Sequence, residues 1–283
     1  MIKQRTKKAK NGKVACREAA FFLCFCLVLP FFSIFSVNSS RRAAAEAEGW
    51  QKIVSFTTWF SQKDRGRCEN IALAASFIDG ITVQAYGEFS FNQTVGDRSA
   101  KKGFKEAKII LNGEFAKGIG GGVCQVSTTV YNAVLLSGLI VTEFHPHSLA
   151  VAYVDPSRDA MVSSTSDLSF YNPYDFSVRI KVKVDGGGLT ASVYGLGVKK
   201  ENLISYKIVS RVLEEIPPPE PLEKEGEEEG VLQSAKNGVK SEAYLEGYKF
   251  GKIISRKLLR KDVYAPVREI LVKKIDVPTK KMP

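Results

Sequence analysis

The sequence predicts an α+β fold, with a mixed domain whose strands lie mainly in its second half and a small all-β module after it. Two segments, 67–79 and 124–137, repeat apolar residues at helical spacing. Between residues 139 and 194, short apolar runs alternate with Pro, Asn, Asp and Gly turn signals, as strands do. Strand-like sequence returns at 241–272, and an uncharged apolar stretch near the N-terminus predicts a transmembrane helix.

The N-terminal part predicts a membrane-associated segment. Residues 1–18 form a basic head, and residues 19–37 are apolar and uncharged, just long enough to span a bilayer. Lys and Arg before the span predict that the head stays in the cytoplasm and that the rest of the chain lies outside. A cleaved signal is the alternative, because small residues at 43–47 offer cleavage-like spacing, although Arg41 and Arg42 after the span favour a retained anchor.

The charge of the chain gives no argument for nucleic acid as a partner, and none is expected. The formal net charge is +11 over 283 residues, and about half of this excess lies in residues 1–20. The remainder is too small to indicate nucleic acid binding, and it is compatible with an anionic cell envelope.

Residues 50–200 contain the elements of the mixed domain. The helix at 67–79 ends before Gly80, and the helix at 124–137 ends before Gly138, a favoured residue after a helix end. Asn112 and Gly113 predict a tight turn in a hairpin over 108–116. The predicted strands span residues 53–60, 139–144, 149–154, 176–184 and 189–194.

Residues 204–275 predict the second module. Its segment 214–230 is rich in Glu and Pro and is expected to be a solvated linker or loop inserted in the module. Residues 241–272 return to strand-like sequence, with a tight turn near Gly251.

A cysteine with a glycine run before it is the strongest candidate for chemistry. Cys124 follows Gly120, Gly121 and Gly122 and opens the second helix, where the helix dipole and free N–H groups favour a thiolate. The only two histidines of the chain, His145 and His147, follow about twenty residues later. A histidine could act as the base, with Asp159 or Asp167 orienting it. Cys68, in ordinary helix sequence, is assigned no role, although it could form a disulfide with Cys124.

Further polar residues are candidates for the lining of a pocket, and two other readings stay open. Gln125, Thr128 and Asn132 follow on the same helix, the last two on the face of Cys124. In the first alternative, the glycines make only a tight turn and Cys124 packs in the core. In the second, His145 and His147 point to one side of an extended segment and bind zinc together with Cys124. No cofactor is otherwise expected.

Several short motifs follow one another along the middle of the chain. They are GEFSFN at 87–92, VGDR at 95–98, GIGGGVCQVSTT at 118–129, HPHS at 145–148, YV at 153–154 and RDA at 158–160. With these motifs, about residues 56–195 resemble the VanW family. The resemblance implies a cell-envelope protein of a Gram-positive-type bacterium, without assigning it a reaction.

The C-terminal module contains three further motifs, GVKSEAY at 238–244, GKIISR at 251–256 and YAPVREI at 264–270. With these motifs, the module resembles the five-glycine domain of surface proteins. This resemblance implies binding to a wall polymer that contains N-acetylglucosamine. Together, the two resemblances predict an anchored envelope protein that binds peptidoglycan or supports its maturation. The alternative is a Cys–His hydrolase or acyl-transfer enzyme acting on cell-wall peptide.

Overall fold

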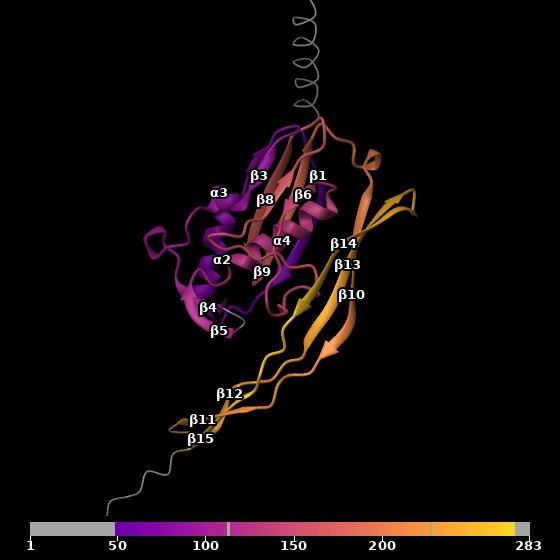
Figure 1. Ribbon diagram of the computed structural model, residues 1–283. Coiled ribbons are helices and arrows are strands. Elements are labelled where there is room, and N and C mark those ends of the chain that lie inside the picture. The colour runs from indigo at the N-terminus through magenta and orange to yellow at the C-terminus, as the bar shows by residue number, and fades with distance from the viewer. Residues whose placement is uncertain (1–48, 112–113, 227, 275–283) are drawn as a thin grey trace, which may run out of the picture. The chain divides into compact units, whose positions relative to one another are not determined.

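The computed structural model describes residues 49–111, 114–226 and 228–274 (Figure 1). Both helices and strands are present, which confirms the α+β class. None of the helices within these residues is long and apolar enough to cross a membrane. The predicted basic head at 1–18 and the predicted span at 19–37 lie outside the described residues.

The main sheet has the strand order β1-β9-β8-β2, with antiparallel neighbours throughout. Val178, Ile180 and Val182 alternate along β8 and are buried, as their period of two predicts. Helices α2 and α4 pack against this sheet and against each other (Figure 1). The strands are β1 (Trp50–Trp59), β2 (Thr82–Val83), β8 (Val178–Asp185) and β9 (Gly188–Leu196), and the helices are α2 (Arg65–Ile78) and α4 (Val123–Leu136).

Helix α4 is the central element of the domain. The predicted apolar stripe of Val126, Val130, Ala133 and Val134 is buried, but the polar side of the helix is buried as well. This occurs because α4 contacts β1, β9, α2, β6 and the C-terminal strand β10 (Ser205–Ile216). The helix is followed by Gly138, whose φ of +82° is the left-handed conformation expected after a helix end.

Smaller elements surround this core. The predicted hairpin is confirmed as β4 and β5, and the strand predicted at 139–144 is confirmed as β6. The strand predicted at 149–154 is wrong, because residues 144–168 form an irregular segment between β6 and β7. The elements are β3 (Glu88–Ser90), α3 (Phe91–Val95), η1 (Ala100–Lys102), β4 (Glu106–Leu111), β5 (Glu114–Ile119), β6 (Ile140–Glu143), β7 (Ser169–Tyr171) and η2 (Lys200–Asn202).

The C-terminal residues form two three-stranded sheets, ordered β10-β13-β14 and β11-β15-β12. Phe250 and Gly251, both at positive φ, make the predicted tight turn between β13 and β14. The expected free linker at 214–230 is corrected in part, because β11 and β12 both pair with β15. The remaining strands are β11 (Leu222–Gly226), β12 (Gly230–Gln233), β13 (Gly238–Lys249), β14 (Lys252–Tyr264) and β15 (Ile270–Lys274).

Candidate functional site

The Cys124 thiol lies in the first turn of α4 and lines a cavity of about 960 Å³. Its side chain is half-buried, and in the thiol form its Sγ donates a hydrogen bond to the carbonyl oxygen of Val162 at 3.4 Å. Neither Cys124 nor Cys68 forms a disulfide. Cys124 is therefore a free thiol that faces a cavity and is not sealed in the core.

The three glycines before Cys124 are required by the tight packing of the turn. Gly120 and Gly122 have φ values of +88° and +108°, which L side chains rarely adopt. A Cβ on Gly121 would lie 2.6 Å from the carbonyl oxygen of Lys108, and one on Gly122 would lie 2.9 Å from a side-chain carbon of Ile71. The structural explanation of the glycine run is thus correct, and the same turn also lines the cavity beside the thiol.

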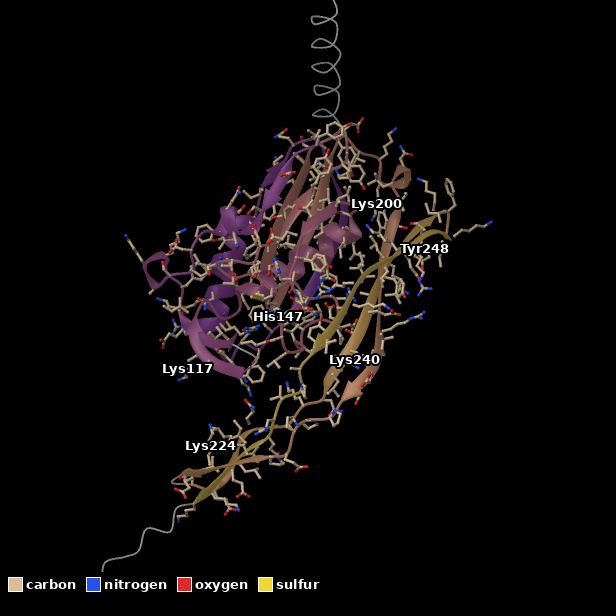
Figure 2. All side chains as sticks on the ribbon, in the orientation of Figure 1. Lys117, His147, Lys200, Lys224, Lys240 and Tyr248 are labelled. Carbon is tan, nitrogen blue, oxygen red and sulfur yellow. The ribbon has the colours of Figure 1, made fainter. Side chains whose placement is uncertain are left out.

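His147 and Asp159 form a buried pair beside the thiol. The imidazole Nδ1 of His147 lies 2.6 Å from Oδ2 of Asp159, and the backbone N–H of His147 donates to the same oxygen at 2.7 Å. The side chain of His147 also lines the cavity, and Figure 2 labels this residue. Because Nδ1 is engaged by the carboxylate, Nε2 is the ring nitrogen that remains for the thiol.

The charges of this cluster favour a thiolate–imidazolium pair. Burial opposes the thiolate, but hydrogen bonding and charge from His147 outweigh it and lower the pKa of Cys124. Burial also opposes the imidazolium, but the carboxylate of Asp159 and the thiol raise the pKa of His147 to about 9. Against its own burial, Asp159 keeps a lowered pKa, mainly through its hydrogen bond with His147. Cys124, His147 and Asp159 therefore have the arrangement of a nucleophile, a base and an orienting acid.

Polar residues of α4 hold the segment that carries Asp159. Thr128 accepts a hydrogen bond from the N–H of Ala160 at 2.9 Å. The Nδ2 of Asn132 donates to the carbonyl oxygen of Arg158 at 2.8 Å. Both side chains are buried and hold residues 158–160 through these bonds. They therefore support the cluster, and neither lines the cavity.

Gln125 joins α4 to its neighbours at the edge of the cavity. Its Oε1 accepts from a guanidinium nitrogen of Arg67 at 2.7 Å, and its Nε2 donates to Thr58 at 3.0 Å and to the carbonyl oxygen of Trp59 at 3.1 Å. The side chain is buried and lines the cavity, but its polar atoms are used by these structural bonds.

His145 and Asp167 lie outside the cluster. The Nε2 of His145 pairs with Glu143 at 2.9 Å on the exposed side of the segment. Asp167 accepts from the N–H groups of Asn92 and Leu168, both at 2.8 Å. Over the described ranges, no group of three or more His, Cys, Asp or Glu side chains is placed to hold a metal ion. The two histidines thus have separate partners, contrary to the arrangement that a shared zinc site requires.

Two residues at the end of β14 were missed from the sequence. Tyr264 donates its hydroxyl to Oδ1 of Asp159 at 2.5 Å, and Arg260 donates to the carbonyl oxygen of Asp159 at 2.6 Å. Both side chains are buried. The available signal was the spacing of Arg260, Asp262 and Tyr264, which places an unusual polar group on one face of a strand.

The comparisons with known proteins match the part of the chain that holds this cluster. Residues 66–194 match the family described as VanW like protein. The uncharacterized protein YoaR of Bacillus subtilis (strain 168) is 40% identical over 168 residues, covering 59% of this chain and 55% of that protein. The vancomycin B-type resistance protein VanW of Enterococcus faecalis (strain ATCC 700802 / V583) is 26% identical over 150 residues, covering 50% and 52%. The chain spans about half the length of these curated relatives.

One solved structure matches a smaller part of the chain. The crystal structure of HP0197-G5 aligns with 24% of this chain and 97% of its own length, at 25% identity and a TM-score of 0.14. That TM-score carries no argument about fold, so the five-glycine character of residues 204–275 stays a prediction. Residues 66–194 match the VanW family, and both curated relatives are similar to the chain over about half of its length or more, so the chain contains a VanW-like domain at residues 66–194.

Proposed function

We propose that the protein is a cell-wall-associated enzyme that uses Cys124 to transfer an acyl group of a cell-wall peptide to water or to an amine. The observation that carries this proposal is the cluster of Cys124, His147 and Asp159 at a cavity of about 960 Å³. A purely structural thiol has no need of a histidine whose pKa is raised to about 9 beside it. Perturbed titratable groups of this kind in a cavity are typical of active sites.

The proposed reaction has two steps. In the first, the Cys124 thiolate attacks the carbonyl carbon of an amide, and the imidazolium of His147 gives its proton to the leaving amine, which yields a thioester and a neutral imidazole. In the second, water or an acceptor amine attacks the thioester. His147 takes the proton of this nucleophile and so returns to imidazolium, while Cys124 leaves as thiolate.

The backbone N–H of Cys124 can stabilise the oxyanion of each step. The N–H groups of Val123 and Gln125 donate to the carbonyl oxygens of Gly120 and Gly122. The N–H of Cys124 itself has no acceptor among the described residues, and it lies at the positive end of the 14-residue helix α4. A free N–H next to the nucleophile, at a helix N-terminus, suits a developing negative charge.

The charge of the cavity suits a substrate that carries a carboxylate. Arg98, Lys108 and Lys236 contribute cations to its lining. The two acidic residues in the lining are already engaged, since Asp64 caps α2 and Asp97 pairs with Lys102 at 3.1 Å. The stem peptides of peptidoglycan have free carboxylates, which makes them a suitable class of substrate for a positively charged cavity.

The site of action is proposed from the sequence. The apolar stretch at 19–37 is proposed to anchor the chain in the cell membrane, with the VanW-like domain outside the cytoplasm. Residues 204–275 are proposed to bind a wall polymer that contains N-acetylglucosamine. Protease added to intact wall-stripped cells should digest the region after residue 42, and protection of that region would contradict this topology. The purified protein should also co-sediment with sacculi at physiological salt, where weak charge attraction is screened.

The enzymatic proposal is tested by trapping the thioester. The full-length protein in detergent would be incubated with a wall peptide and analysed by intact mass spectrometry after acid quenching. We expect a mass increase equal to the acyl fragment, absent in Cys124→Ala and retained in Cys68→Ala. The same peptide with its free carboxylate amidated should acylate more slowly. If the wild-type protein binds sacculi but never forms an adduct with any wall peptide, the binding function stands and the enzyme does not.

A further inference from the structure

The hydrogen bonds around Asp159 point to a direct role of the C-terminal module in the active cluster. The carboxylate of Asp159 is only 1% exposed, and its two oxygens have different partners. Oδ2 accepts two bonds from His147, at 2.6 and 2.7 Å. Oδ1 accepts from the hydroxyl of Tyr264 at 2.5 Å and lies 3.4 Å from a guanidinium nitrogen of Arg260. One side of the carboxylate therefore faces the catalytic histidine, and the other faces the C-terminal strand β14.

We propose that Tyr264 and Arg260 are positioning residues that hold Asp159 against His147, so that the VanW-like domain requires the C-terminal module to complete its active cluster. The proposal rests on the proposed function for its catalytic meaning, although the hydrogen-bond geometry is independent of it. Neither residue lies within residues 66–194, the part that matches the VanW family.

Arg260 is held in place by its own partners. Its side chain is 3% exposed, and its Nε pairs with Asp262 at 2.5 Å on the same face of β14. A second guanidinium nitrogen donates to the backbone carbonyl of Asp159 at 2.6 Å. The fork geometry of Arg lets it serve both partners at once, which fixes the backbone of Asp159 relative to the strand.

Tyr264 also fixes the backbone just before Asp159. Its hydroxyl accepts a hydrogen bond from the N–H of Ser157 at 2.8 Å, while it donates to Asp159. Ser157 has φ of +61°, an uncommon conformation for a residue with a side chain, and its hydroxyl bonds that of Ser241 in β13 at 2.7 Å. The C-terminal module thus holds both the carboxylate and the turn that presents it.

A further backbone contact ties the same module to the histidine segment. The N–H of Ala265, next to Tyr264, donates to the carbonyl oxygen of Ser148 at 2.8 Å, and Ser148 follows His147. The end of β14 therefore contacts the chain on both sides of the His147–Asp159 pair. A shift of this strand end would move both members of the pair.

The test compares Tyr264→Phe with Tyr248→Phe. Both tyrosines belong to the C-terminal module, and each donates its hydroxyl to a carboxylate. Tyr264 donates to Asp159, whereas Tyr248 donates to Glu246 at 2.7 Å. Figure 2 shows Tyr248 well separated from His147. The pH dependence of Cys124 alkylation would be measured in the full-length protein. We expect the thiol pKa to rise in Tyr264→Phe, with about a tenfold loss of alkylation rate below the wild-type pKa for each unit of rise. Tyr248→Phe should match wild type.

The sign of the change separates positioning from a simple effect of charge. A carboxylate that loses a donor but keeps its place becomes a stronger acceptor for His147, and the thiol pKa would then fall. A carboxylate that loses its orientation stabilises the imidazolium less, and the thiol pKa rises. If wild-type Cys124 has a lowered pKa, an unchanged or further lowered thiol pKa in Tyr264→Phe would overturn the proposal.

A second measurement tests whether Tyr264 and Arg260 hold Asp159 against His147, without reference to thiol reactivity. The chain has two histidines, so a His145→Gln background leaves His147 as the only imidazole for ¹⁵N-histidine NMR. We expect a protected, hydrogen-bonded Nδ1–H that exchanges at least about tenfold faster with water in Tyr264→Phe and in Arg260→Lys, but not in Tyr248→Phe. Equal exchange rates of the Nδ1 proton in all variants would overturn the positioning role of Tyr264 and Arg260. If the exchange rates change as expected but wild-type Cys124 has an ordinary pKa, the positioning role stands and the proposed enzyme fails.

Discussion

Oδ2 of Asp159 accepts two hydrogen bonds from His147, one from the backbone N–H at 2.7 Å and one from the ring Nδ1 at 2.6 Å. The backbone bond fixes where the histidine sits, and the ring bond fixes how its imidazole is turned. This double contact defines the tautomer, because a neutral ring must carry its proton on Nδ1 to donate to the carboxylate. Nε2 is then free to exchange a proton with Cys124.

Asp159→Asn should lower both the fraction of Cys124 that is thiolate and the free energy of unfolding. Without the carboxylate, the pKa of His147 falls toward its ordinary value and that of Cys124 rises, so alkylation at neutral pH should slow by at least about tenfold. The guanidinium of Arg260 also loses a buried partner, and removal of one member of a buried ion pair costs about 3–5 kcal/mol of unfolding free energy. Urea denaturation measures the second effect. The exposed Asp185→Asn is the control, and equal losses in the two variants would argue against this role of Asp159.

Acylation should have a bell-shaped pH dependence. The thiolate must be present, so the acid limb should lie below the ordinary thiol pKa of about 8.5. The imidazolium must supply a proton to the leaving amine, so the rate should fall as the pH rises through about 9, where His147 loses its proton. Initial rates of thioester formation across this range provide the measurement. A rate that keeps rising above pH 9 would show that His147 is not the proton donor.

Gly122→Ala should destabilise the domain. Its φ of +108° and a Cβ only 2.9 Å from Ile71 make any side chain unfavourable, and the conformation alone costs roughly 1–2 kcal/mol. Thermal unfolding should show a decrease of at least about 2–4 °C in Tm. Gly230→Ala is the matched control, because a Cβ there meets nothing within 4 Å and its φ is not positive. A similar Tm for both variants would contradict the packing of the glycine turn.

Thr128→Val tests the support that α4 gives to residues 158–160. The substitution keeps the shape but removes the buried acceptor of the Ala160 N–H, which costs about 1–3 kcal/mol. Because Asp159 lies next to Ala160, Cys124 should also become less reactive at neutral pH. Thr190→Val, which removes an exposed hydroxyl pair with Thr57, serves as the comparison. If the reactivity of Cys124 is unchanged in Thr128→Val, Thr128 does not help to hold Asp159 in position.

Patterns in the sequence predicted the elements whose apolar residues recur at a regular period. Helices α2 and α4 and the strand face of Val178, Ile180 and Val182 follow from periodicity alone. The strand predicted at 149–154 is wrong, because an apolar run becomes a strand only with a pairing partner, and this run lies in the irregular segment that carries His147. Strand β11 escaped prediction for the opposite reason. Its Glu-rich sequence looks solvated, but Leu222 pairs with Ile270, nearly fifty residues away.

The site shows the same limit. Cys124 and His147 stood out because the residue types are rare in this chain and their neighbours are distinctive. Asp159 was one of two possible carboxylates, and only the fold separates it from Asp167. Arg260 and Tyr264 lie about a hundred residues further along the chain, in a module that the motifs do not cover. No local pattern relates a strand face to a distant carboxylate, so their contact with Asp159 required the structure.

The most direct test of the proposed site is the pH dependence of alkylation of Cys124 and Cys68 in one molecule. The full-length protein would be treated with iodoacetamide from about pH 5 to about pH 10, and peptides containing Cys124 and Cys68 would be quantified by mass spectrometry. We expect Cys124 to react with a midpoint below about pH 8.5, and we expect His147→Ala, but not His145→Ala, to raise this midpoint. The proposed site is contradicted if Cys124 reacts only after denaturation, or if its midpoint is ordinary and unaffected by His147→Ala.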